Sequence, residues 1–417
     1  MAQLSNDCFA TGERPMSVDA ALALLVERIT CIAGTEAVAL ADADHRILAE
    51  PVTAGLDLPP FDNSAVDGYA VRFDDLAPSG DSRLPVAGRL AAGDRAVAGE
   101  GRHAVRIFTG APMPDGFDTV FMQEDVRPDG AGRVLLPAGL ACGANRRCAG
   151  EDLPRGAQAL SAGRRLAPAD LALLSALGLT QISVRVPLRV AVFSTGNEVA
   201  APGTPLGPGQ LYDANRTMLL AMARRRGCTV TDGGILPDRR AAVATALREA
   251  AGRHDLVLTS GGVSTGEEDH VRTALEANGT LTLWRVGIKP GRPIAFGMVG
   301  GTPFVGLPGN PAAAFVTFAL LVRPLLARLA GERHETPRPM PVRSGFSYRK
   351  KEGRREYVRV RIKREVDGSA VAEKHPREGA GIITSLTETD GLVELPDDLT
   401  RLQPGDGVGF LPYAVLY

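Results

Sequence analysis

The sequence has almost no excess charge and few cysteines, and these shortages exclude several classes of protein. Its 417 residues carry 47 Lys and Arg against 48 Asp and Glu, a formal net charge of −1. The chain therefore shows no electrostatic footprint for DNA, RNA or an anionic membrane surface. The five cysteines form no C-x-x-C pair, which argues against a disulfide framework or a zinc knuckle and favours a reducing cytosol.

Long apolar runs and targeting signals are missing too. No stretch approaches 18 uncharged apolar residues, and the N-terminus MAQLSNDCFATGERP has no basic flank followed by an apolar run. The longest apolar segment, PAAAFVTFALLV at 311–322, is too short to span a bilayer. We therefore expect a cytoplasmic protein without a membrane-spanning segment.

What is present is a change of pattern along the chain. Residues 17–29 and 168–179 have apolar side chains at helical spacing, whereas short strands broken by Gly, Pro and Asp fill the region from about 50 to 145. A chain of this length indicates about two to four domains. We predict a discontinuous helical base domain, 15–56 and 146–186, that carries an inserted β-rich domain, 57–145.

From residue 188 onward, strand and helix patterns alternate. LRVAVFST, TVTDGGILPD and DLVLTSGG read as strands, with helical patterns between them. Such alternation predicts a parallel sheet covered by helices on both faces, with ligand loops at the carboxyl ends of its strands. We expect this α/β domain over 187–334 and, after the Pro-rich linker GERHETPRPMP, a small β domain over 335–417.

Three glycine-bearing turns follow strands of the α/β domain: STGNE at 194–198, SGGVSTGEED at 260–269 and GLPGNP at 306–311. Each turn alone is also explained by the backbone freedom of glycine. Together they should meet at one edge of the sheet, where glycines allow close approach and helix N-termini offer N–H groups to an anion. Neither G-x-x-x-x-G-K-[ST] nor G-x-G-x-x-G occurs, which disfavours a P-loop NTPase and the usual dinucleotide site.

Acidic side chains follow the same strands. Glu198, Asp238 and Asp269 each come close after a strand end, and Mg²⁺ commonly takes one or two carboxylates plus phosphate oxygens. A metal ion would make the acids compatible with a bound phosphate. As helix N-caps or first-turn acids, the same residues would need no metal.

Positive charge arrives in VGIKPGRPIAFG, where Lys289 and Arg292 flank a Pro-Gly turn. Two cations held so close favour an oxyanion as their partner. A solvated turn with two surface charges is the alternative.

Three polar motifs lie outside the α/β domain. PPFDNSAVDGYA contains Asp62, RIFTGAPMP presents Thr109 in a glycine turn, and GANRRCAGED ends on Asp152 at an expected domain junction. Asx-turns explain such clusters without a function, so the motifs alone leave both interpretations open.

In this order, the motifs resemble those of the molybdopterin molybdenumtransferase family, which includes MoeA in bacteria and the E domain of gephyrin in animals. The resemblance runs from about residue 15 to the end of the chain. It rests on PPFDNSAVDGYA, RIFTGAP, the GED at 150–152, FSTGNE, YDAN at 212–215, TSGGVSTGEED, IKPGRP and GLPGNPAAA.

The resemblance implies a multidomain fold with a central three-layer α/β/α molybdopterin-binding domain and a small barrel-like C-terminal β domain. It implies a homodimer whose site lies between the α/β domain and the partner subunit's β insertion. Adenylylated molybdopterin and molybdate would react there, with Mg²⁺, to give molybdenum cofactor and AMP. An upstream molybdopterin adenylyltransferase is a candidate partner.

The resemblance also assigns roles to numbered residues. The catalytic positions are Asp62, Thr109, Asp152, Lys289 and Arg292. The substrate-binding positions are Thr195, Gly196, Ser260, Gly261, Gly262, Ser264, Pro308, Gly309, Asn310, Arg359 and Ser385. The metal-binding positions are Glu198, Asp238 and Asp269. Arg292 stands where the family commonly has lysine, and its planar guanidinium would hold an oxyanion with a different geometry.

Two rival classes of function stay open at this point. One is a molybdopterin adenylyltransferase or a nucleotide pyrophosphatase built on the same α/β domain. A fused adenylyltransferase should show a second SGG-type domain, and one copy is present. The other is a non-catalytic scaffold, for which no feature of the sequence argues.

Overall fold

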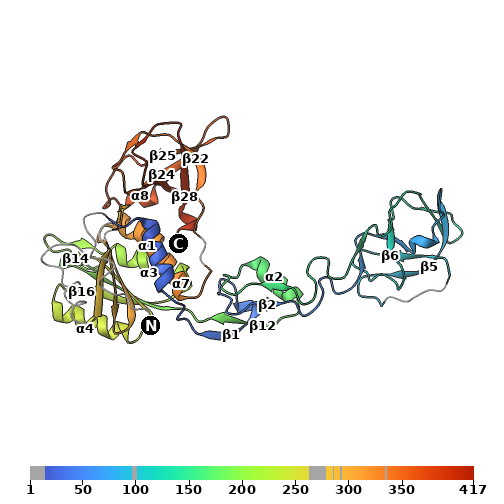
Figure 1. The fold of residues 1–417 in the computed structure, drawn as a ribbon, viewed down its shortest axis with the longest axis horizontal. Coiled ribbons are helices and arrows are strands. Elements are labelled where there is room, and N and C mark those ends of the chain that lie inside the picture. Colours follow the sequence, from blue (N-terminus) through green and yellow to red (C-terminus); the bar gives the residue numbers. More distant parts are fainter. Residues whose placement is uncertain (1–14, 96–100, 263–278, 285, 292–293, 334–335) are drawn as a thin grey trace.

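The parts of the molecule lie along an extended path rather than around one centre (Figure 1). The structure is a computed structural model, and it describes residues 15–95, 101–262, 279–284, 286–291, 294–333 and 336–417. The α/β domain lies at one end with the C-terminal β domain beside it, and the inserted β domain lies at the other end. The base domain, with α2 and β12, runs between them.

A six-stranded sheet in the order β16-β13-β17-β21-β20-β18 forms the centre of the α/β domain. Its first four strands are parallel, and β20 and β18 are joined by antiparallel pairings. The bounds are β13 (Arg189–Thr195), β16 (Thr229–Leu236), β17 (Leu256–Ser260), β18 (Gly279–Trp284), β20 (Ile294–Val299) and β21 (Thr302–Leu307). β17 is buried throughout, as expected for a parallel strand covered on both faces.

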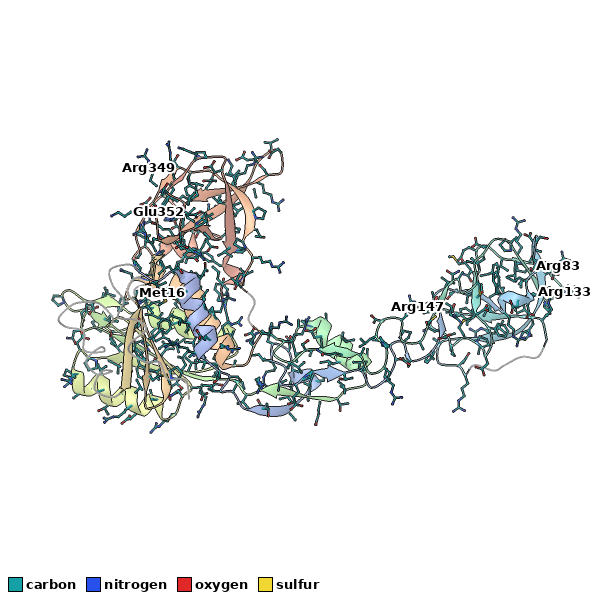
Figure 2. The ribbon with its side chains drawn as sticks, in the orientation of Figure 1. Met16, Arg83, Arg133, Arg147, Arg349 and Glu352 are labelled. Carbon is teal, nitrogen blue, oxygen red and sulfur yellow. The ribbon has the colours of Figure 1, made fainter. Side chains whose placement is uncertain are left out.

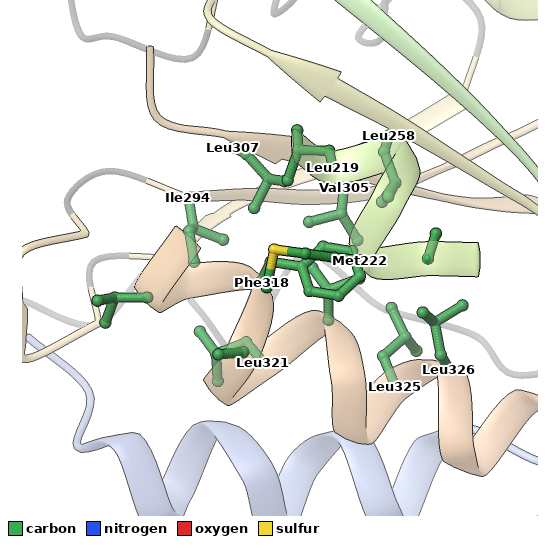
Figure 3. Packing of buried hydrophobic residues seen from close by; sticks show 14 of the residues in the cluster. Leu219, Met222, Leu258, Ile294, Val305, Leu307, Phe318, Leu321, Leu325 and Leu326 are labelled. Atoms are coloured by element: carbon green, nitrogen blue, oxygen red, sulfur yellow. The ribbon is translucent and has the colours of Figure 1, made fainter. Parts of the chain in front are cut away.

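Helices cover both faces of this sheet, which confirms the predicted three-layer arrangement. α4 (Arg240–Ala251) packs on one face through Val243 and Leu247. The other face carries α3 (Asn215–Arg225), α6 (Pro311–Thr317), the π-helical turn η4 (Phe318–Val322) and α7 (Arg323–Leu329). Figure 3 shows Phe318 among Leu219, Met222 and Val305 in this core.

The passage Pro311–Leu329 is apolar and long enough to cross a membrane, but 89% of its most apolar window is buried inside the molecule. It serves as the core helix of the α/β domain, since Leu321, Leu325 and Leu326 pack in the same cluster. The apolar run noted in the sequence is therefore explained by packing within the protein.

The helix predicted over 17–29 forms as α1 (Val18–Arg28), and the Ser17 hydroxyl accepts a hydrogen bond from the Ala20 N–H at 3.1 Å. Its buried face, Val18, Ala21 and Leu25, belongs to the core cluster of the α/β domain. The predicted base-domain segment 15–56 thus begins with a helix whose apolar face packs in the α/β core. Helical periodicity predicts which face of a helix is apolar, but it does not predict which domain core that face packs against.

The base domain is built from two separate passages of the chain. β1 (Thr35–Ala39) pairs antiparallel with β12 (Gln181–Arg185), and β2 (Val52–Thr53) pairs with β11 (Gln158–Leu160). The predicted helix at 168–179 forms as α2 (Pro168–Ala176). These elements pack around Leu48, Leu166 and Leu174, next to the short 3₁₀ turn η2 (Leu40–Asp42).

The inserted domain is a separate β unit with its own core. Its sheet has the order β7-β4-β6-β5-β9-β8. The bounds are β3 (Asn63–Ser64), β4 (Gly68–Val71), η3 (Phe73–Asp75), β5 (Ser82–Leu90), β6 (Ala104–Ile107), β7 (Thr119–Met122), β8 (Arg127–Pro128), β9 (Arg133–Leu136) and β10 (Arg146–Arg147). β3 pairs with β10 where the chain enters and leaves the domain.

The C-terminal domain is a closed five-stranded barrel, as predicted, because an additional β24–β26 pairing joins the ends of its sheet. Its elements are β22 (Met340–Ser344), β23 (Tyr348–Arg349), β24 (Arg355–Arg364), β25 (Ala370–Lys374), α8 (Thr384–Thr387), β26 (Gly391–Leu395), β27 (Arg401–Leu402), β28 (Gly407–Pro412) and η5 (Tyr413–Val415). β19 (Ile288–Lys289), from the α/β domain, pairs with the start of β24. This pairing places Lys289 against the barrel.

Candidate functional site

A cavity of about 700 Å³ opens at the carboxyl ends of β13, β17 and β21. It brings together the three turns singled out in the sequence. Its lining includes Thr195, Gly196, Glu198, Asp238, Ser260, Gly261, Gly262, Pro308, Gly309 and Asn310. This is where ligands bind in open parallel sheets. Ser264 and Asp269 lie outside the described residues.

Asn215, the first residue of α3, fixes the turns of this cavity to one another. Its side-chain amide donates to Ser260 Oγ at 2.8 Å and to the Gly309 carbonyl at 2.7 Å. The amide oxygen of Asn215 and the hydroxyl of Thr195 are buried and, within the described chain, have no hydrogen-bond partner. Such atoms are costly to leave unpaired, so they indicate where a polar ligand would bind. Asn215 stands in the YDAN motif, but sequence reasoning alone does not assign it to the site.

Gly261 lets the turn after β17 approach the turn after β13. Its φ is +88°, and a Cβ there would lie 2.8 Å from the Thr195 carbonyl oxygen. A residue with a side chain at position 261 would therefore push the turn after β17 away from the turn after β13.

Gly261→Ala is therefore expected to lower the free energy of unfolding by about 1–2 kcal/mol, measured by urea denaturation. The matched control is Gly252→Ala at the end of α4, where φ is −70° and the nearest atoms are 3.7 Å away. That change should leave stability unaltered or raise it slightly. Equal stabilities for the two variants would contradict the crowding argument.

Two carboxylates, Glu198 and Asp238, lie on the wall of the cavity. Asp238 Oδ2 accepts a hydrogen bond from Asn197 N–H at 3.0 Å, and the Asp238 N–H donates to Asn197 Oδ1 at 3.3 Å. This reciprocal pair holds Asp238 against the turn of Glu198. Within the described residues, no group of three or more His, Cys, Asp or Glu is placed to hold a metal ion.

A second cavity, of about 170 Å³, lies between β19 and the barrel. Its charged lining consists of the cations Lys289, Arg359, Lys374 and Arg377 and the acids Glu356 and Glu378. Arg359 is 9% exposed and donates from Nη2 to the Gly379 carbonyl at 3.0 Å. Its buried Nε has no partner among the described residues. The lining therefore offers an unsatisfied cationic donor. Arg292 lies outside the described residues.

Lys289 is held in place by Tyr348 and Glu356. Its Nζ lies 3.1 Å from Tyr348 Oη and 3.1 Å from Glu356 Oε2. Burial lowers the pKa of Lys289, but the hydrogen bonds and negative charge of these neighbours outweigh burial and leave the pKa above its ordinary value. The ammonium group is thus charged at neutral pH.

Ser385 is placed differently from the prediction, which set it beside molybdate. Its side chain is fully buried and its hydroxyl donates to the Ile382 carbonyl. It lines neither of the two cavities. In this structure Ser385 holds the turn that leads into α8.

The remaining predicted polar residues, in the inserted domain and at its junction with the base domain, make separate local contacts. Asp67 Oδ1 accepts hydrogen bonds from the N–H and the hydroxyl of Thr109, both at 2.8 Å, and these bonds hold the pKa of Asp67 below its ordinary value. Asp62 accepts from Ala149 N–H at 2.8 Å and lies 3.5 Å from Arg146. The Asp152 side chain is exposed. These residues line neither cavity of their own chain.

Comparison with known proteins shows to which family the chain belongs. The MoeA N-terminal region (domain I and II) matches residues 16–178, a probable molybdopterin-binding domain matches 191–328, and the MoeA C-terminal region (domain IV) matches 341–413. The molybdopterin molybdenumtransferase of Haemophilus influenzae is 36% identical over 400 residues, 95% of this chain and 98% of that protein. The enzyme of the same name from a Nostoc species is 36% identical over 396 residues, 92% and 90% of the two chains.

A solved structure agrees with these sequence matches. The molybdopterin biosynthesis MoeA protein of Pyrococcus horikoshii superposes with a TM-score of 0.82 and 29% identity, covering 96% of this chain and 100% of that one. Sequence and fold are thus shared over nearly the full length. The chain belongs to the MoeA family and is a molybdopterin molybdenumtransferase.

Proposed function

We propose that the larger cavity binds adenylylated molybdopterin and that the smaller one binds molybdate. Membership of the family implies molybdopterin and molybdate as substrates. The observation that carries the assignment is that the cavities adjoin: the short segment 379–381 lines the smaller one with Gly379 and Ala380 and the larger one with Gly381. Two substrates bound on either side of this segment would be close enough to react.

The smaller cavity suits a tetrahedral dianion. Lys289 and Arg359 supply charged donors, and charge-assisted hydrogen bonds to an oxyanion are the strongest of their kind. The buried Nε of Arg359 lacks a protein partner among the described residues, so a bound oxyanion would satisfy it. Glu356 is occupied by Lys289, Tyr348 and Arg354, which leaves it turned to the protein network rather than to the ligand.

The larger cavity suits the phosphate end of adenylylated molybdopterin. The Gly261 N–H already donates to the Leu307 carbonyl at 3.0 Å, but the turn at Gly261 and Gly262 has no side chains and lets a phosphate approach closely. Thr195 offers a buried hydroxyl that has no partner in the described chain. Glu198 and Asp238 on the same wall would hold Mg²⁺ together with phosphate oxygens. When bound, the ion would neutralise the charge that develops as the phosphoanhydride is cleaved. Asp269 is proposed as a further ligand and lies outside the described residues.

The inserted domain is distant from the larger cavity of its own chain (Figure 1). Asp62 and Thr109 belong to this domain, Asp152 follows it at the junction with the base domain, and the three residues do not line the larger cavity of their own chain. We propose a homodimer in which the inserted domain of one subunit reaches the α/β cavity of the other. We also propose that the enzyme is cytoplasmic and receives its adenylylated substrate from an upstream adenylyltransferase.

The proposed reaction is tested by mixing the purified protein with adenylylated molybdopterin, molybdate and Mg²⁺ and following AMP and active cofactor. Release of AMP that requires molybdate supports insertion. Release without molybdate would instead support a nucleotide pyrophosphatase, and absence of any release would leave the scaffold interpretation.

In the same assay, Asp238→Asn is expected to slow AMP release at least about tenfold and to raise the Mg²⁺ concentration that gives half-maximal rate. The change removes one negative charge from the cavity wall without altering the size of the side chain. The matched control is Glu249→Gln, an exposed acid on α4 of the same domain, which should behave as wild type. An unchanged Mg²⁺ requirement in Asp238→Asn would contradict the metal assignment.

A further inference from the structure

Three neighbouring strands of the inserted domain place two arginines and a tyrosine side by side. Tyr69 of β4 is paired with Arg106 of β6, and Arg106 is paired with Arg89 of β5. Residues that face each other across paired strands project from the same side of the sheet. The three side chains therefore form a row across one face of the domain.

Phe108, two residues beyond Arg106, completes this row. The Phe108 ring centroid lies 4.6 Å from the guanidinium carbon of Arg89 and 4.8 Å from that of Arg106. The guanidinium carbon of Arg106 also lies 5.0 Å from the Tyr69 ring centroid. We call Tyr69, Arg89, Arg106 and Phe108 the arginine–aromatic row. Cations and aromatic rings contact one another along its length.

The row brings two positive charges together on neighbouring parallel strands, and like charges at this distance repel each other. Arg106 donates to the Gly68 carbonyl at 3.1 Å and to Gln123 Oε1, neither of which carries charge. Arg89 is exposed and has no carboxylate within 4.0 Å in the described part of the chain. Closely spaced positive charges without a carboxylate partner are typical of a binding surface for an anion.

The row adjoins the residues assigned to the reaction in this domain. Phe108 directly precedes Thr109, whose N–H and hydroxyl bind Asp67. The positive charge of Arg106 is among the influences that lower the pKa of Asp67, after the bonds from Thr109. A group bound on the row would thus lie beside Thr109 and Asp67.

We propose that the arginine–aromatic row binds the adenosine monophosphate part of adenylylated molybdopterin. A purine presents a flat π face that stacks on aromatic rings and on guanidinium planes, and its phosphate is a suitable partner for the two closely spaced arginines. The inference rests on the proposed function, since it concerns the same substrate. The inference adds that the inserted domain binds AMP, the leaving group of the reaction, while the α/β domain binds the pterin.

The proposal is tested on the full-length protein with AMP as the probe, by isothermal titration calorimetry. Arg89→Gln and Phe108→Ala are each expected to weaken AMP binding about tenfold, and Phe108→Tyr, which keeps an aromatic ring, should restore it. The control Arg133→Gln alters an exposed arginine at the outer end of the same domain (Figure 2) and should bind AMP as wild type does. Ribose 5-phosphate should bind more weakly than AMP, because it lacks the base.

Turnover provides a second measurement that separates binding from folding. In the molybdate-dependent assay, Arg89→Gln should raise the KM for adenylylated molybdopterin and leave the KM for molybdate unchanged. Unaltered AMP affinity in both Arg89→Gln and Phe108→Ala would overturn the inference, and so would equal affinities of the wild-type protein for AMP and ribose 5-phosphate. Either result could occur while the wild-type enzyme still inserts molybdenum, so it would leave the proposed function intact. Failure of the wild-type protein to release AMP with molybdate would instead overturn the proposed function.

Discussion

Replacement of Arg359 with glutamine is expected to lower kcat/KM for molybdate about 100-fold, a loss of about 2.7 kcal/mol of transition-state binding. Arg359 is nearly buried, its Nη2 binds the Gly379 carbonyl, and its Nε has no partner in the described chain. Burial also lowers the pKa of this guanidinium from its ordinary value, which reflects the cost of holding the charge out of water. A dianion in the cavity would offset that cost, and glutamine cannot supply the charge.

The selectivity of this effect distinguishes a molybdate residue from a structural one. The KM for adenylylated molybdopterin should change little, and the melting temperature should be maintained, because removal of an uncompensated buried charge relieves desolvation. The matched control is Arg361→Gln, an exposed arginine on the same strand that donates to the Glu388 carbonyl and lines neither cavity. A fall of less than about threefold in kcat/KM for molybdate would correspond to less free energy than a charged hydrogen bond contributes. Such a result would contradict the assignment of the smaller cavity to molybdate.

The larger cavity was predictable because its parts are local motifs. Each turn follows a buried strand, and the carboxyl ends of parallel strands meet at one edge, so Thr195, Gly261 and Gly309 could be brought together from their spacing alone. Asn215 belongs to YDAN, but nothing local indicates that its side chain ties Ser260 to Gly309. A bridging role depends on the loop positions of three segments, which the fold supplies.

The smaller cavity was less predictable because its residues come from several barrel strands. Lys289 was found from its Pro-Gly turn, whereas Tyr348, Glu356 and Lys374 stand in no motif and meet only through the strand pairings of the barrel. Ser385 shows the opposite case, a residue in a plausible segment whose side chain turns into the protein. The arginine–aromatic row likewise depends on register between strands distant in sequence.

The α/β domain and the base domain are joined by a nearly buried ion network, and its disruption is expected to have the largest effect on stability. Glu332 accepts from Arg165 Nε at 3.0 Å and Nη2 at 2.8 Å, and it also pairs with Arg226. Arg165 reaches on to the His45 carbonyl at 2.7 Å in the base domain. Removing this acid would leave two largely, but not fully, buried arginines without their carboxylate partner.

Glu332→Gln should therefore lower the free energy of unfolding by about 3–5 kcal/mol at neutral pH, measured by urea denaturation. Burial raises the pKa of Glu332, but the hydrogen bonds and charges of Arg165 and Arg226 outweigh burial and hold the pKa below its ordinary value of 4.5. The unfolded chain thus takes up the proton more readily than the folded one. The stabilisation is complete above pH 4.5 and is lost as the pH falls through the lower folded value.

The difference between wild type and Glu332→Gln should consequently begin to shrink below about pH 4.5, where unfolded wild-type chains take up the proton, and should disappear only below the lower folded pKa, where the folded protein also carries a neutral group at this position. The control Glu352→Gln alters an exposed acid of the C-terminal domain (Figure 2) and should leave stability unchanged at every pH. If the difference in unfolding free energy stayed constant down to acid pH, the packing of the Glu332 side chain, not its charge, would stabilise the junction between the two domains. A shrinking difference would identify Glu332 as the charged link that fixes the base domain, and with it the direction of the inserted domain, to the α/β domain.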